Sequence, residues 1–261
     1  MSLCEVHWSS DVLEKKVGMY VVLPDKGVGE PPFPVYYLLH GLSDDYTVWL
    51  RRTRVEWYVR QTPLIIVMPD GYRGFYTDNA DGPAYATYLA EELVEFVERT
   101  FPAARSREGR FIGGLSMGGY GALRLALGRP ELFASANSHS GALMHGSRNG
   151  PREGGPLTEQ EFRRIFGARP VGSDHDLVAL ARRAKERCAR DGSPLPRLLL
   201  DCGVDDVLID DNRAFHKALT EMGVAHEYRE HAGEHTWDYW DEHVKEALAF
   251  HTGALPHERQ V

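Results

Sequence analysis

Long hydrophobic runs are missing from this 261-residue chain. Its longest apolar stretches, residues 35–39 and 64–68, have the length of a strand, whereas a helix that crosses a bilayer needs about 20 apolar residues. The sequence therefore predicts no membrane-spanning segment and no membrane partner. Apolar residues make up 43% and charged residues 26% of the chain, a balance that excludes collagen, coiled coil and intrinsic disorder.

A surplus of basic residues is missing as well. Thirty Lys and Arg residues face thirty-eight Asp and Glu residues, which gives a formal net charge of −8. Because proteins that bind duplexes or anionic membranes usually carry a basic surplus, nucleic acid is not expected as a partner. The basic run at residues 182–190 is interpreted as a solvated helix face.

Cysteine is scarce, with three residues and no C-x-x-C pair. This count and spacing exclude a disulfide framework and a structural zinc site built on cysteines. Residues 1–5 include no basic segment followed by an apolar one, so no export signal is expected. Reduced thiols without an export signal predict a cytoplasmic protein.

Short apolar runs alternate with helical periodicity along the chain. The expected strands are residues 3–8, 16–23, 35–39, 64–68, 110–115, 133–138, 197–200 and 225–231. The expected helices include residues 84–99, 117–127 and 158–166, with two more around 215–222 and 240–248. Strands separated by helices predict one α/β domain over 1–261, with a mostly parallel central sheet and helices on both faces. The first two strands are expected to be antiparallel.

One segment breaks this rhythm. Residues 146–155 are rich in Gly, Pro, Arg, Asn and Ser and contain almost nothing apolar. Long loops in compact α/β domains often carry function. We therefore expect a small cap or insertion over residues 144–175, although a plain excursion between strand and helix would look the same.

The sequence Gly114-Leu115-Ser116-Met117-Gly118 fits the G-x-S-x-G pattern of a nucleophile elbow. Its chemistry needs a serine on a tight strand-to-helix turn, where flanking side chains would clash. Ser116 lies between an expected strand and an expected helix, as the motif requires. Ser116 is therefore the predicted nucleophile.

An α/β-hydrolase places its triad in the chain order Ser, then Asp or Glu, then His. Asp205 and Asp206 follow an expected strand after Ser116, and position favours Asp206 with Asp205 as the alternative. His235 lies between the last expected strand and the last helix, and it is the predicted base. Asp206 would fix the tautomer of His235 and stabilise the imidazolium.

No metal or cofactor is expected. His231 and His235 lie close in sequence, but the H-E-x-x-H order of a zinc protease is absent. The oxyanion hole is predicted to use two backbone N–H groups, from Leu42 after an apolar strand and from Met117 after the nucleophile. His40 is interpreted as a structural residue that supports this loop.

Aromatic residues lie next to several of the expected site loops. They could line an apolar or sugar-stacking pocket, or they could complete the core. The predicted substrate-binding residues are Trp49, Tyr76 and Trp237.

Five stretches together resemble one known family. They are Leu38-Leu39-His40-Gly41-Leu42, Val67-Met68-Pro69-Asp70-Gly71, residues 114–123, residues 201–206 and Gly233-Glu234-His235-Thr236-Trp237. This set resembles the esterase D-like family of α/β-hydrolases. The family includes S-formylglutathione hydrolases, tributyrin-type acyl esterases, feruloyl and acetylxylan esterases, and mycobacterial mycolyltransferases. The resemblance implies Ser116, Asp206 and His235 as the triad.

Two departures from this family bear on the substrate. S-formylglutathione hydrolases usually carry Cys and Thr after His-Gly-Leu and a histidine before the nucleophile, whereas this chain has Ser43-Asp44-Asp45 and Leu115. The resemblance therefore favours a serine carboxylesterase that acts on a small-molecule substrate, a short-chain acyl or aryl ester. A homo-oligomer is a further expectation. A thioesterase, a feruloyl or acetyl carbohydrate esterase, and a catalytically dead binding module are the alternatives.

Overall fold

The computed structural model describes residues 1–253. Its centre is an eight-stranded sheet with the order β1-β2-β4-β3-β5-β6-β7-β8. The strands are β1 (Ser2–Ser10), β2 (Lys15–Leu23), β3 (Val35–Leu39), β4 (Ile65–Pro69), β5 (Arg110–Leu115), β6 (Ser135–His139), β7 (Arg197–Gly203) and β8 (Glu227–His231). β2 pairs antiparallel with β1 and with β4, and the other pairs are parallel. The predicted mostly parallel sheet with two antiparallel opening strands is confirmed.

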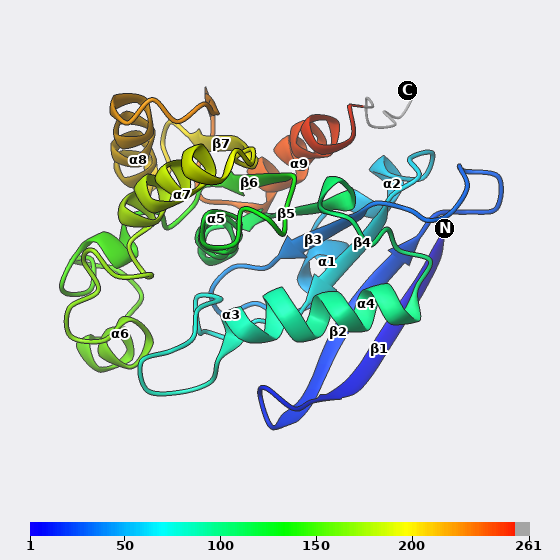
Figure 1. Cartoon of the computed structure of the whole chain (residues 1–261), viewed down its shortest axis with the longest axis horizontal. Helices are drawn as coiled ribbons and strands as arrows, with labels where there is room; N and C mark the ends of the chain where they lie inside the picture. Colours follow the sequence, from blue (N-terminus) through cyan, green and yellow to red (C-terminus); the bar gives the residue numbers. More distant parts are fainter. Residues whose placement is uncertain (254–261) are drawn as a thin grey trace.

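Helices cover both faces of this sheet (Figure 1). They are α1 (Val48–Arg52), α2 (Val55–Tyr58), α3 (Tyr85–Thr87), α4 (Val94–Thr100), α5 (Met117–Gly128), α6 (Glu159–Phe166), α7 (Leu177–Asp191), α8 (Ile209–Glu221) and α9 (Trp237–Thr252). A π-helical segment, η1 (Tyr88–Leu93), joins α3 to α4, and two 3₁₀ turns are η2 (Arg107–Gly109) and η3 (His145–Ser147). The sequence pattern does not predict α1 and α2, because a helix of one turn shows no periodicity. Within residues 1–253, no helix has the length and apolar character to cross a bilayer.

Two hydrophobic cores lie on opposite faces of the sheet. Successive side chains of a strand point to opposite faces. In β3, Val35, Tyr37 and Leu39 join the core beneath α5, whereas Tyr36 and Leu38 join the core beneath α1, α2 and α9. All five side chains are buried, which explains why this strand is continuously apolar rather than alternating.

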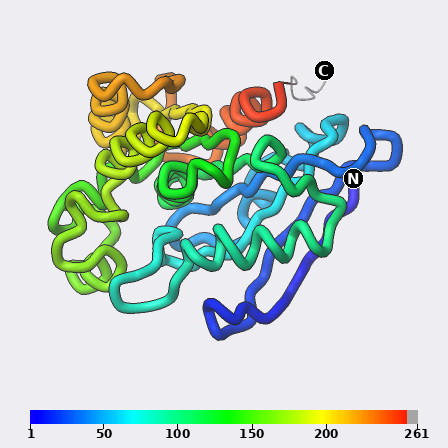
Figure 2. Tube along the Cα trace, in the orientation of Figure 1, coloured from blue at the N-terminus to red at the C-terminus, as the bar shows by residue number. Residues whose placement is uncertain are grey.

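The carboxyl ends of the parallel strands meet at one edge of the sheet, where ligands bind in open α/β folds. The loops that follow β3, β5, β7 and β8 therefore gather there from distant parts of the sequence. Figure 2 shows the corresponding chain path, from the blue N-terminal strands on one side to the orange α8 on the other. This edge carries every predicted catalytic residue.

The segment 144–175 packs on the domain rather than extending from it. Phe162 and Phe166 of α6 are buried, and the ring of Phe166 packs at 5.1 Å from Phe75 and 5.9 Å from Tyr120. A capping box with Thr158 begins this helix. The segment thus shares the core on the α5 face of the sheet.

Candidate active site

Ser116 lies at the turn from β5 into α5 with φ 53° and ψ −113°. A residue with a side chain adopts a positive φ only where its surroundings hold it there. A Cβ placed on Gly114 or on Gly118 would come within 2.5 Å of the Leu39 carbonyl oxygen. Glycine is therefore required at both positions, and the predicted elbow geometry is present.

The backbone of Ser116 is fixed by three hydrogen bonds. Its N–H donates to the carbonyl of His139 at 2.9 Å, and its own carbonyl accepts from the N–H groups of Ala142 at 3.0 Å and Tyr120 at 3.1 Å. These bonds connect the elbow to the end of β6 and to the first turn of α5. The strained conformation of Ser116 is thereby held by its neighbours.

His235 contacts both of its predicted partners. Its Nε2 lies 3.1 Å from Ser116 Oγ, and its Nδ1 donates to the carboxylate of Asp206 at 2.9 Å and 3.0 Å. The carboxylate of Asp206 is fully buried, whereas the imidazole is 26% exposed. The structure thus brings together three side chains from the ends of β5, β7 and β8.

Asp206 is held as an anion. Burial alone would raise its pKa, but the hydrogen bond and the charge of His235 lower it, and the N–H of Leu208 and the hydroxyl of Ser140 lower it further. The net effect is a pKa below the ordinary value of 3.8. Asp205 is exposed, and only its backbone N–H is anchored, at 3.1 Å from the Gly233 carbonyl. The structure therefore brings Asp206, and not Asp205, to His235.

The loop after β3 lies beside the nucleophile. A Cβ placed on Gly41 would lie 3.8 Å from Ser116 Cβ. His40 is buried, its Nδ1 donates to the Gly41 carbonyl at 2.8 Å, and its Nε2 accepts from the Gly71 N–H at 2.8 Å. These contacts support the interpretation of His40 as a structural residue.

The three predicted substrate-binding aromatics differ in exposure. Trp49 is 1% exposed and its Nε1 donates to the Leu39 carbonyl, while Tyr76 is fully buried and its hydroxyl donates to the His40 carbonyl. Both side chains point inward and support the loop after β3 in this structure, so their burial weighs against a direct contact with a ligand. Trp237 is half-buried at the start of α9 and remains a candidate.

Ser140 is a site residue that the sequence does not predict, and Trp240 belongs to the aromatics next to the expected site loops. The Ser140 hydroxyl contributes to the lowered pKa of Asp206 and accepts a hydrogen bond from Trp240 Nε1 at 3.2 Å. The ring of Trp240 in turn packs edge-on against His235, with centroids 4.9 Å apart. The position of Ser140 directly after β6, at the carboxyl edge of the sheet, was the available signal.

A further residue joins the loop after β3 to the segment 144–175. Arg73 donates to Ser43 Oγ at 2.7 Å and to Glu161 of α6 at 2.9 Å. On the opposite side, Arg152 donates to the Val207 carbonyl, next to Asp206, at 2.6 Å. The segment 144–175 therefore contacts the surroundings of the site from two directions.

Comparison with known sequences shows the family of this chain. A family model described as "Putative esterase" matches residues 10–251. The acetyl esterase of Caldicellulosiruptor saccharolyticus is 31% identical over 262 residues, which cover 95% of this chain and 97% of that protein.

Two solved structures from Staphylococcus aureus are similar over nearly their whole length. The fluorophosphonate-binding serine hydrolase FphF has a TM-score of 0.84 at 27% identity, with 96% of this chain and 98% of that chain covered. The S-formylglutathione hydrolase FrmB has a TM-score of 0.83 at 27% identity, with coverage of 97% and 100%.

Proposed function

Since the chain belongs to the esterase family and is a serine carboxylesterase, we propose that Ser116, His235 and Asp206 form its catalytic triad. One observation carries this assignment. The imidazole of His235 contacts a serine hydroxyl through one nitrogen and a buried carboxylate through the other. This arrangement gives a nucleophile, a base and an orienting acid in the order of an α/β-hydrolase.

In the first half of the reaction, His235 Nε2 takes the proton from Ser116 Oγ as this oxygen attacks the ester carbonyl. The C–O bond to the alcohol then breaks, and the imidazolium returns the proton to the leaving alkoxide. Asp206 stabilises the imidazolium and holds the tautomer that carries its proton on Nδ1. The product at this stage is an acyl-enzyme on Ser116.

In the second half, water replaces the alcohol. His235 takes a proton from water, the hydroxide attacks the acyl carbonyl, and the proton passes to Ser116 Oγ as the acid leaves. Apart from water and the substrate, all the groups in these steps come from the chain, so the proposed mechanism uses no cofactor and no metal.

We assign the oxyanion hole to the backbone N–H groups of Leu42 and Met117. Met117 is the first residue of α5, where helical N–H groups have no partner within the helix. Leu42 follows Gly41, which lies against Ser116. Loss of one such donor typically costs about 2.7–4 kcal/mol of transition-state stabilisation.

A short-chain acyl or aryl ester is the proposed substrate. The similarity to an acetyl esterase supports this choice. The similarity to FrmB favours an S-formylglutathione-type thioester as the second candidate, while Ser43 and Leu115, where such hydrolases usually carry other residues, weigh against it. Half-buried Trp237 could contact the acyl or aryl group, and the segment 144–175 would border the entrance as a cap of the single domain.

The free thiols of Cys4, Cys188 and Cys202 are compatible with the proposed cytoplasmic location. Cys188 and Cys202 are buried and Cys4 is partly exposed. The net charge of −8 supports a small molecule rather than nucleic acid as the partner.

A substrate panel tests the proposal. It contains p-nitrophenyl esters from acetate to octanoate, methyl ferulate and S-formylglutathione, measured as kcat/KM. The highest value is expected for a short acyl or aryl ester, and a clear preference for S-formylglutathione would replace the first candidate by the second. A fluorophosphonate probe should label the wild type and not Ser116→Ala, whereas a dead binding module would not be labelled at all.

A further inference from the structure

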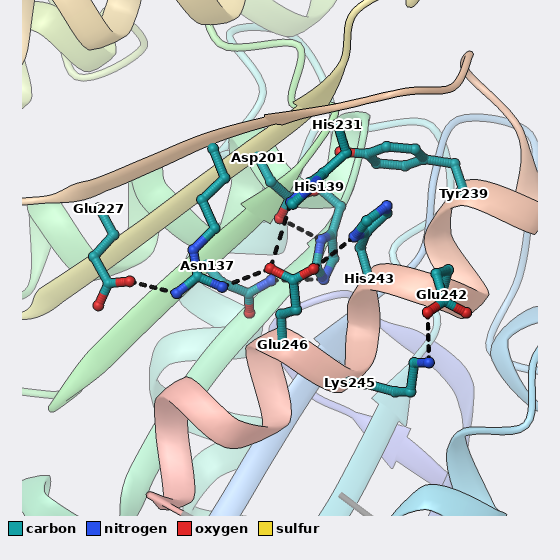
Figure 3. Close-up of polar contacts among 11 residues, drawn as sticks. Asn137, His139, Asp201, Glu227, His231, Tyr239, Glu242, His243, Lys245 and Glu246 are labelled. Carbon is teal, nitrogen blue, oxygen red and sulfur yellow. Dashed lines mark hydrogen bonds and ion pairs between the residues drawn. The ribbon is translucent and has the colours of Figure 1, made fainter. Parts of the chain in front are cut away.

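A cluster of two imidazoles and a carboxylate lies where β8 meets α9, outside the triad (Figure 3). His231 is the last residue of β8, and His243 and Glu246 lie one turn apart on α9. One nitrogen of each imidazole and one oxygen of the carboxylate lie within 4.8 Å of one another. Among residues 1–253, this is the one group of three such side chains with that spacing.

The donor atoms of this cluster face one another. His243 Nδ1 lies 2.8 Å from Glu246 Oε1, and His231 Nε2 lies 3.4 Å from Glu246 Oε2. The two rings are stacked with centroids 4.1 Å apart, and one nitrogen of each lies near the same carboxylate. His231 Nε2 is buried and has no hydrogen-bond partner. A buried polar atom of this kind calls for an explanation.

We infer that His231, His243 and Glu246 form a zinc site. Two imidazole nitrogens and a carboxylate oxygen are ligands that Zn²⁺ binds in a tetrahedral set, with water as the fourth ligand. Magnesium and calcium prefer oxygen ligands, so this donor set does not suit them. Glu246 Oε1, His243 Nδ1 and His231 Nε2 are the ligating atoms.

The carboxylate is already oriented for this role. Arg229 donates to Glu246 Oε2 at 2.5 Å and to Glu227 at 2.6 Å. Hydrogen bonds of this kind to a ligating carboxylate tune a metal site. Oε1 accepts a hydrogen bond from His243 Nδ1 at 2.8 Å, and zinc would replace the proton of that bond, which is released to solvent. The charge of Arg229 opposes a cation, but Glu227 and Glu246 together outweigh it.

Binding requires only a small adjustment. The stacked rings are inclined by 16°, so their lone pairs run nearly parallel and must converge on the metal. The side chain of His231 is 30% exposed and can turn about its Cβ–Cγ bond. His243 is more fixed, because the Tyr239 ring packs on it with centroids 4.3 Å apart.

The position of the site defines its effect. The chain leaves β8 at His231, forms the loop with His235 and then enters α9. A zinc ion that joins His231 to His243 and Glu246 would fasten this loop at both ends without touching Ser116. The zinc ion therefore stabilises the fold and takes no part in the reaction.

Zinc titration of the full-length protein, stripped with a chelator, tests this site. Isothermal titration calorimetry with ZnCl₂ should give one saturable equivalent, and zinc should raise the Tm of the stripped wild type. His243→Ala should weaken zinc at least about tenfold, since even changes outside the ligand set cost that much, and it should lose the Tm increase. Glu246→Gln gives the same test if His243→Ala does not fold.

Two control variants test whether zinc binds to other histidines instead. His216 and His226 form another imidazole pair, with ring nitrogens 2.8 Å apart, and His226→Ala should bind zinc like the wild type. His235→Ala should do so as well. Absence of saturable binding, equal binding by His243→Ala and the wild type, or loss of binding in either control would overturn the site.

Discussion

Two Asp–His pairs lie near each other at the carboxyl edge of the sheet. In both, a carboxylate from the β7 region accepts from an imidazole Nδ1: Asp201 from His139 at 2.7 Å and Asp206 from His235 at 2.9 Å. The pairs differ at the other nitrogen. His139 Nε2 accepts from the amide of Asn137 at 3.0 Å, whereas His235 Nε2 faces the Ser116 hydroxyl. The group that contacts Nε2, and not the carboxylate at Nδ1, decides which imidazole can act as a base.

The buried pair supports the reactive one. Side chains of His139 and Asp201 are 0% and 2% exposed, and the Tyr239 hydroxyl donates to Asp201 at 3.0 Å (Figure 3). The backbone carbonyl of His139 accepts from Ser116, and that of Asp201 accepts from Ser140. One Asp–His pair therefore holds the backbone on which the other pair acts.

Removal of the Ser116 hydroxyl, which only the pair of His235 contacts, should have the largest effect on the rate of ester hydrolysis. Ser116→Ala keeps the same Cβ in the elbow, so the fold should persist while ester hydrolysis falls by several orders of magnitude, as with the roughly millionfold loss in a protease triad. Steady-state kinetics with a p-nitrophenyl ester and circular dichroism would measure this. A folded variant that keeps more than about a hundredth of the wild-type kcat would contradict the assignment.

Loss of the Asp206 carboxylate should have the second-largest effect on kcat. Asp206→Asn leaves the imidazolium unsupported and favours the wrong tautomer, so we expect kcat to fall by roughly 10⁴, as in the protease case. Asp205→Asn is the matched control, because that side chain is exposed and does not reach His235. If Asp205→Asn were the crippled variant, the acid would have to be reassigned.

The pH profile should report the reactive pair alone. The pKa of the Asp206 carboxyl is lowered from its ordinary value of 3.8, so Asp206 stays ionised near neutral pH. The ionised carboxylate stabilises the folded state, and this contribution is lost only as the pH falls below 3.8 and through the lowered pKa. Since a general base works only in its unprotonated form, kcat/KM is expected to rise from acidic toward neutral pH. EDTA should leave the rate unchanged. A flat profile would argue against His235 as the base.

Features that depend on neighbouring residues in the chain could be predicted from the sequence. Ser116 could be found because the elbow, its glycines and the flanking strand and helix are contiguous. The burial of Trp49 and Tyr76 could not be predicted, because closeness to a loop in sequence does not give the direction of a side chain. The expected end of β7 at Leu200 was too early, because a charged residue, Asp201, is buried there by a partner on β6.

Longer-range contacts escape this kind of reasoning. Ser140 and Trp240 lie 100 residues apart and meet only through packing of α9 on the sheet. The same holds for His231. In the sequence it lies close to His235, whereas in the structure its side chain lies against Glu246 of α9. Side chains from separate elements gain a common role only after the topology has brought them together.

The same substitution in the buried pair should have the smallest effect on rate. In Asp201→Asn, an amide replaces a carboxylate that accepts from both His139 and Tyr239. An amide has one acceptor oxygen, so one of these donors loses its partner, which costs about 1–3 kcal/mol. The free energy of unfolding in urea should fall by that amount, while kcat and the pH profile of the folded protein stay near the wild type. A kcat loss as large as that of Asp206→Asn, with unchanged stability, would mean that the two pairs act as one catalytic unit.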